Sequence, residues 1–125
     1  MTTREDIQGY LIRSGLTHQE VDQDNWLVRV AEGIDPVVVH LHGPVLLVRA
    51  DVGVVPKKDR EAFLADLLRR NAEELVHCSY GLTGVKIIIS GAMPLENLDY
   101  NEFISTLDDM ALALGRTAPE PAEQK

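Results

Sequence analysis

The feature that most constrains the fold is the stretch PVVVHLHGPVLLVRADVG, residues 36–53, in which two apolar, β-branched runs flank Gly43-Pro44. Such runs favour strands, and a short glycine-containing break between them is typical of a β-hairpin. Gly-Pro is not a favoured two-residue turn pair, so a longer loop with another register is the alternative. A two-residue turn at the break predicts a register that pairs His42 with Val45, Leu41 with Leu46 and Val39 with Val48.

The two faces of this predicted hairpin differ in polarity. Side chains alternate between the faces of a strand, so every second residue shares a face. One face is entirely apolar and consists of Val37, Val39, Leu41, Leu46, Val48 and Ala50. The opposite face is mixed and consists of Val38, His40, His42, Val45, Leu47 and Arg49. A sheet face in contact with water is usually more polar than this, so the mixed face is either covered by another element or used for binding.

Helix signals flank the hairpin on both sides. Thr3 and Asp6 have capping-box spacing and Gly15 suits a helix C-terminus, which predicts a first helix over residues 3–14. Residues 20–31 then alternate like a strand. A second helix is predicted from Asp59, as its N-cap, to about residue 76. Its apolar stripe consists of Phe63, Leu64, Leu67, Leu68, Asn71, Ala72 and Leu75.

Asn71 is the polar residue that interrupts this stripe. We interpret it as an amide bonded to nearby backbone, and recognition of a partner's backbone is the alternative.

The last third of the chain predicts a short extended piece, a turn, a strand over residues 85–90 and a final helix. The strand is expected to stop at Gly91, and Asp99 with Glu102 has the spacing of a helix start. Gly115 is expected to end the helix. The predicted order is α-β-β-β-α-β-β-α, an antiparallel α+β sheet with three helices in one domain, residues 1–115. The Pro-rich, charged residues 116–125 are predicted to be a disordered tail.

Composition narrows the function classes. The formal charge of −8 argues against nucleic-acid binding, which requires basic surface. No apolar run approaches the roughly 20 residues that a membrane span needs. The start, MTTREDIQGY, is charged and has no apolar signal core, and Cys78 has no second cysteine to pair with. These features indicate a protein of the reducing cytoplasm that contacts neither nucleic acid nor membrane.

No arrangement of residues indicates catalysis or a cofactor. His40 and His42 share one side of a strand and could present two imidazoles to a metal, but His18, His77 and Cys78 lack motif spacing for a third ligand. We therefore interpret the pair as histidines on a half-exposed face. Cys78 and His77 are strand neighbours that point to opposite faces, which disfavours a nucleophile and base pair. The sequence predicts a protein that is not an enzyme and carries no cofactor or metal.

Two passages resemble known families. LLRRNAEEL, residues 67–75, is similar to the Asn-containing second helix of the CesT-like type III secretion chaperones and the related YbjN family. VKIIISGAMPLENLDYNEFISTLDDMALAL, residues 85–114, is similar to their final strand, Pro-Leu-Glu-x-Leu connection and last helix. The resemblance covers about residues 3–115.

The resemblance implies a homodimeric cytoplasmic protein without catalytic residues that works by holding another protein. In the secretion chaperones, the second helix and a neighbouring strand form most of the dimer. This places five residues near a two-fold interface: Leu64, Leu67, Leu68, Ile87 and Ile89. Partner segments in that family lie extended over apolar patches of the sheet and first helix. The corresponding residues here are Tyr10, Leu11, Val38, His40, Val45 and Leu47.

Two other classes of function stay open at the level of sequence. A small-ligand sensor would need an apolar pocket with a few polar groups, which His40, His42 and Asn71 could supply. A metal-dependent enzyme would need His40 and His42 to bind zinc or nickel.

Overall fold

The computed structural model describes residues 1–117, and these form three helices and a six-stranded antiparallel sheet. The strands lie side by side in the order β1-β2-β3-β4-β6-β5. The elements are α1 (Arg4–Ser14), β1 (His18–Asp22), β2 (Asn25–Val28), β3 (Val37–His42), β4 (Val45–Val54), α2 (Arg60–Glu73), β5 (Ser79–Thr83), β6 (Lys86–Pro94) and α3 (Tyr100–Thr117).

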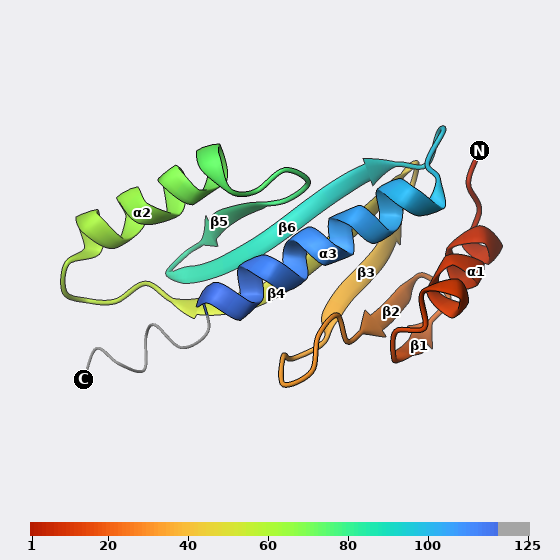
Figure 1. Cartoon of the computed structure of the whole chain (residues 1–125), viewed down its shortest axis with the longest axis horizontal. Helices are drawn as coiled ribbons and strands as arrows, with labels where there is room; N and C mark the ends of the chain where they lie inside the picture. The colour runs from red at the N-terminus through yellow and green to blue at the C-terminus, as the bar shows by residue number, and fades with distance from the viewer. Residues whose placement is uncertain (118–125) are drawn as a thin grey trace.

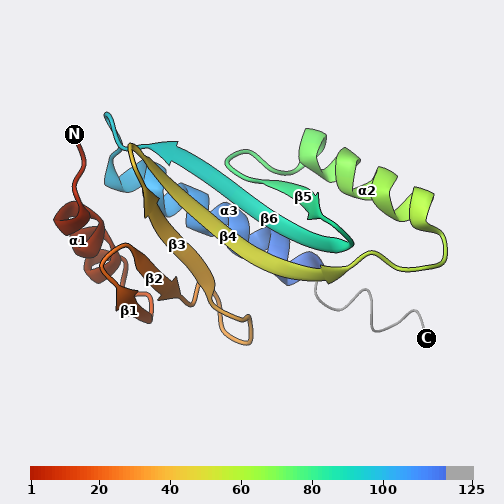
Figure 2. The same cartoon turned by 180° about the vertical axis from the view of Figure 1, so that it is seen from behind.

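The helices are distributed unevenly around the sheet. Helix α3 runs along one face of the sheet, α1 lies toward the β1–β2 end of the same side, and α2 lies beyond the β5 edge (Figure 1). Seen from behind, β3, β4 and β6 have no helix in front of them (Figure 2). Among the described residues, one sheet face is therefore covered and the other is open. No helix in this part of the chain is long and apolar enough to cross a membrane.

The predicted class and order are confirmed, with one refinement before the central hairpin. Residues 20–31, read as a single strand-like segment, contribute to two strands, β1 and β2, which pair antiparallel. The chain reverses between them because the carboxylate of Asp22 accepts the backbone N–H of Asp24 at 2.9 Å, a short-range bond that stabilises a turn.

The register of the β3–β4 hairpin is the one predicted from a two-residue turn. Val39 pairs with Val48, Leu41 with Leu46 and His42 with Val45. Gly43 has a φ of 58°, which glycine adopts at little cost. The predicted apolar face is the inner one: Leu41 is half-buried, and the other five of its six residues are buried in the core.

The core lies between the covered face of the sheet and the two helices α1 and α3. Its fully buried side chains come from the sheet, from α1 and from α3, so no two of these parts form the core alone. The largest are Trp26, Phe103, Ile7, Leu11, Leu46 and Ile89.

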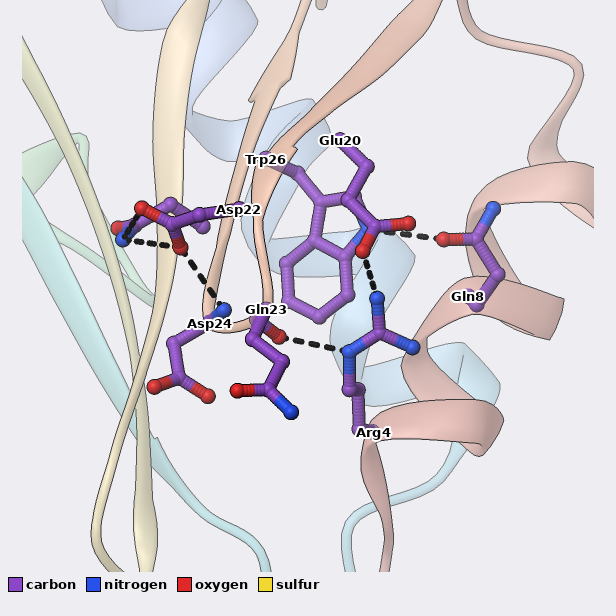
Figure 3. A network of polar contacts seen from close by, with 8 residues as sticks. Arg4, Gln8, Glu20, Asp22, Gln23, Asp24 and Trp26 are labelled. Carbon is purple, nitrogen blue, oxygen red and sulfur yellow. Dashed lines mark hydrogen bonds and ion pairs between the residues drawn. The ribbon is translucent and has the colours of Figure 1, made fainter.

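Helix α1 is capped as predicted and is bonded to the first hairpin. Thr3 and Asp6 form a reciprocal capping box, with N-to-O distances of 2.9 and 3.2 Å. Arg4 pairs with Glu20 and donates from Nε to the carbonyl of Gln23 at 2.6 Å (Figure 3). Figure 3 also shows the indole N–H of Trp26 donating to Gln8, at 2.9 Å. These bonds hold α1 on the covered face.

Helix α2 differs from prediction at both ends. Asp59 occupies the N-cap position, but with a φ of 56° its side chain makes no capping bond, so the predicted side-chain cap is wrong. The helix ends at Glu73 and not near residue 76. The interpretation of Asn71 is confirmed, because its side chain bonds the backbone of Tyr80.

Strand β6 continues through Gly91 to Pro94, so the prediction that the strand stops at Gly91 is wrong. The glycine is needed for a different reason: a Cβ there would lie 2.9 Å from the carbonyl oxygen of His77. Gly91 allows the chain before β5 to pass close over the strand.

The connection between β6 and α3 is hydrogen-bonded to the β3–β4 turn and to the N-terminus of the chain. Leu95 and Leu98 are buried, as expected for anchors, and the Asp99 carboxylate accepts the N–H of Glu102 at 2.8 Å at the helix start. The backbone of Leu95 bonds Pro44 of the hairpin turn, and the Thr2 hydroxyl donates to the Leu98 carbonyl at 2.7 Å.

Helix α3 continues past Gly115 to Thr117, so the predicted end at Gly115 is two residues short. Of the predicted disordered tail, residues 118–125 lie outside the described residues.

Candidate functional site

The uncovered side of the sheet is its most distinctive surface. We call the side chains on this side the open face. They lie opposite the buried positions of β2, β3, β4 and β6, and the pairing register aligns them across the strands. Its apolar members are half-buried or exposed, and they alternate with His40, His42, Arg49 and Ser90. The apolar members are Leu27, Val38, Val45, Leu47, Ile88 and Ala92.

Two hollows border the open face. One, of about 570 Å³, lies beside Leu47 and Ala92 and is bounded by residues 76–79. The other, of about 590 Å³, lies beside Val38 and Arg49 and is bounded by residues 33–36. The open face is therefore partly apolar and carries two hollows that share Arg49, a form that suits an extended chain more than a compact ligand.

Four of the six residues predicted to contact a partner lie together on this face: Val38, His40, Val45 and Leu47. The other two do not. Leu11 is fully buried, and Tyr10 packs its ring 5.6 Å from that of Phe103. The expectation that Tyr10 and Leu11 flank the mixed face is wrong, because α1 packs on the covered side of the sheet.

Of the five residues predicted to form a dimer interface, two are at least partly exposed and three are buried. Leu68 is 69% exposed and Leu64 is half-buried on α2. Leu67, Ile87 and Ile89 have exposed fractions of 6%, 2% and 0%. These three face the core of the single chain, so they offer no surface to a second copy. The exposed apolar side of α2 is what remains of that set.

His40 and His42 lie side by side, with ring centroids 5.7 Å apart. The Nδ1 atom of His40 is 2.8 Å from the amide oxygen of Asn25, and the amide nitrogen of Asn25 is 2.9 and 3.2 Å from the two Asp22 carboxylate oxygens. The pKa of Asp22 is lowered, first by this Asn25 bond and then by the backbone N–H of Asp24. Asp22 is therefore ionised at neutral pH.

Asn71 does not join the two histidines. It lies on α2 beyond the β5 edge, and strands β4, β6 and β5 separate it from His40 on β3. The small-ligand sensor considered above would need a pocket lined by His40, His42 and Asn71, and this fold does not bring the three residues together.

Cys78 is bonded in a way that prevents nucleophilic use. Its thiol donates to the Asp109 carboxylate at 3.3 Å, and the backbone N–H groups of Val76 and His77 donate to the same oxygen. Burial, with a smaller contribution from Asp109, raises the pKa of Cys78 to about 12. The thiol stays protonated at neutral pH, and the thiolate is the nucleophile.

Among residues 1–117, no group of three or more His, Cys, Asp or Glu side chains could hold a metal ion. The residues that sequence reasoning missed are Leu27, Ile88 and Ala92 on the open face and Asn25 beside His40. Alternation within β6 marks Ile88 and Ala92 as a pair sharing one face. Which face this is depends on the pairing of β4 with β6, which no local pattern shows.

Comparison with known proteins gives a consistent result. The family model described as CesT_Tir_1 matches residues 1–123. No curated protein matches the chain by sequence.

Three solved structures share the fold at low sequence identity. A chain of the ExoU–SpcU complex from the type III secretion system of Pseudomonas aeruginosa has a TM-score of 0.75 at 18% identity, covering 92% of this chain and 98% of that one. YbjN from E. coli has a TM-score of 0.68 at 16% identity, covering 98% and 93%. A chain of the complex of the Yersinia pestis secretion chaperone SycH with a fragment of YscM2 has a TM-score of 0.69 at 13% identity, covering 92% and 99%.

Proposed function

The chain belongs to the CesT_Tir_1 family, and we propose that it is a non-enzymatic protein-binding module that holds an extended segment of a partner protein on its open face. Two of the similar structures are complexes with other proteins, ExoU with SpcU and SycH with a fragment of YscM2, which supports binding of a protein. The proposal has two versions, a secretion chaperone with one client or a YbjN-type regulator.

The observation that carries the proposal is the open face itself. Its apolar side chains Val38, Val45 and Leu47 are partly exposed in the middle of a sheet, where no helix of the described residues covers them. Covering them with a partner's apolar side chains would gain roughly 25 cal/mol for each Å² removed from water. His40, Arg49 and Ser90 lie among them and can bond a partner's polar groups.

We also propose that two copies associate through α2. Leu68 is 69% exposed on α2, and Leu64, one turn before it, is half-buried beside the part of the helix that packs on the sheet. An apolar helix side without a partner favours association, because its burial removes apolar surface from water. The predicted dimer interface is thereby reduced to Leu64 and Leu68, because Leu67, Ile87 and Ile89 are buried in the core.

The test of partner binding uses Leu47→Asp, which places a charge in the middle of the open face. A partner is first identified by mass spectrometry after pull-down from the native cell and then purified, so that affinity is measured with two defined proteins. Loss of a central contact residue is expected to weaken binding by about 2 kcal/mol or more, roughly thirtyfold.

The matched control is Leu112→Asp, the same change at an exposed leucine of α3. Leu112→Asp should bind the partner with unchanged affinity, and circular dichroism should show both variants folded. Equal affinity of Leu47→Asp and the natural chain would contradict the placement of the site. Should Leu47→Asp unfold, Val38→Asp at a more exposed position of the same face replaces it.

A further inference from the structure

We infer that His40 and His42 form a two-imidazole site for a divalent transition-metal ion of the Cu²⁺, Ni²⁺ or Zn²⁺ class. The two rings lie on the open face with centroids 5.7 Å apart and planes 35° apart. At this distance one ring nitrogen of each histidine can reach the same ion. The inference does not depend on the proposed binding of a partner protein.

The first argument is that the hydrogen bonds around His40 determine which ring nitrogen is free. The Asn25 amide nitrogen faces the Asp22 carboxylate at 2.9 and 3.2 Å, and a carboxylate can only accept. The amide oxygen of Asn25 must therefore point to His40, where it lies 2.8 Å from Nδ1. An amide oxygen also only accepts, so Nδ1 carries the proton, and in the neutral ring Nε2 keeps its lone pair.

This arrangement is the one that metal-binding histidines use. In such sites the second ring nitrogen donates to a carboxylate or carbonyl oxygen, which fixes the tautomer and the ring orientation. Here the bonds run from His40 to Asn25 and on to the Asp22 carboxylate, so a negative charge lies behind the imidazole. Sequence reasoning considered the two histidines without this support.

The second argument is access. His42 is exposed at the end of β3, and it lies opposite Val45 in the hairpin register. The residues paired with His40 and His42 on β4, Leu47 and Val45, are apolar and carry no positive charge. With two protein ligands, water supplies the remaining positions, so an open site of modest affinity is expected.

The choice of ion follows from the ligands. Imidazole nitrogens suit Zn²⁺, Cu²⁺ and Ni²⁺, whereas Mg²⁺ and Ca²⁺ prefer oxygen ligands. Affinity for the first-row ions is expected to peak at Cu²⁺.

The experiment titrates the full chain, purified without a histidine tag, with Cu²⁺ in calorimetry and follows the histidine ring resonances by NMR. One Cu²⁺ per chain is expected to broaden His40 and His42 first, and His40→Ala or His42→Ala should each weaken binding by about tenfold or more. His18→Ala is the matched control, because His18 lies on another strand with its Nδ1 against the Leu16 carbonyl. The affinity of the His18→Ala variant for Cu²⁺ should equal that of the natural chain.

Asn25→Ala tests the positioning role of Asn25 separately. Ring ¹⁵N shifts should report a loss of the fixed Nδ1–H tautomer of His40, together with weaker Cu²⁺ binding, while His42 keeps its own shifts. The inference is overturned if no Cu²⁺ binds at micromolar concentration, or if His40→Ala and His42→Ala bind as tightly as the natural chain. Broadening of His18 or His77 ahead of both open-face histidines also overturns it.

Discussion

The side-chain amide of Asn71 pairs with the backbone of Tyr80 in both directions. Its oxygen accepts the Tyr80 N–H at 2.8 Å and its nitrogen donates to the Tyr80 carbonyl at 3.2 Å. Tyr80 lies in β5, an edge strand of the sheet, so α2 supplies the bonds that a further strand would make. Asn71 thereby protects this edge of the sheet at Tyr80, and edge strands require such protection against pairing with another chain.

Asn71→Ala is expected to lower the free energy of unfolding by about 1–3 kcal/mol, because it removes the two hydrogen bonds between this side chain and the Tyr80 backbone. Urea denaturation measures the change. The control is Asn101→Ala, at an exposed position of α3, which should change stability little. If the two variants were equally stable, Asn71 would not be closing the edge.

Gly91→Ala is expected to destabilise the chain by about 1–3 kcal/mol, since a Cβ would lie 2.9 Å from the His77 carbonyl oxygen and residues 76–78 would have to move. Thermal unfolding measures the effect. Gly9→Ala is the matched control: nothing lies within 4 Å of its Cβ position, and alanine favours the helix α1 by about 0.5–1 kcal/mol. Opposite signs for the two substitutions are the expected result, and equal effects would contradict the close approach at Gly91.

Asp109→Ala is expected to cost about 1–2 kcal/mol at neutral pH, because the Val76 and His77 N–H groups lose their acceptor. Burial acts to raise the pKa of Asp109, but the bonds from His77, Cys78 and Val76 outweigh it, and the pKa lies below its ordinary value of 3.8. A lowered pKa gives stability that is present above the unfolded-state pKa and is lost as pH falls through the folded-state value.

The difference in stability between the natural chain and Asp109→Ala should therefore be largest at neutral pH and shrink below about pH 4. Denaturant titrations at several pH values measure it. Asp108→Ala, at the exposed neighbouring carboxylate, is the control for substitution at this point of α3 and should change stability little at neutral pH. A difference that stays constant down to the acid limit would show that Asp109 acts without its charge.

Leu68→Asp is expected to weaken the proposed α2-mediated dimer by about tenfold or more, because a charge would enter an apolar interface. Light scattering across a concentration series measures the dissociation. Ile12→Asp on α1, at 66% exposure, is a matched change outside α2 and should leave association unaltered. A folded Leu68→Asp variant that dimerises like the natural chain would place the interface elsewhere.

Local patterns in the sequence determined much of this protein. The capping box at Thr3 and Asp6, the register of the β3–β4 hairpin and the apolar alternation of its inner face depend on neighbours within a few residues, and the structure has all three. The α+β class and the order of helices and strands follow from such patterns, because period and turn chemistry are local properties.

Only the tertiary structure decided which surfaces are free. Whether Val38 and Leu47 are covered depends on the side of the sheet that α1 and α3 occupy. The sequence does not show this side, and the prediction that Tyr10 and Leu11 of α1 flank the mixed face was wrong for this reason. The pairing of Leu47 with Ala92, the edge bonds of Asn71 and the contact of Asp109 with residues 76–78 join distant parts of the chain. Each is set by packing of whole elements against one core, which the alternation of one strand or the stripe of one helix cannot specify.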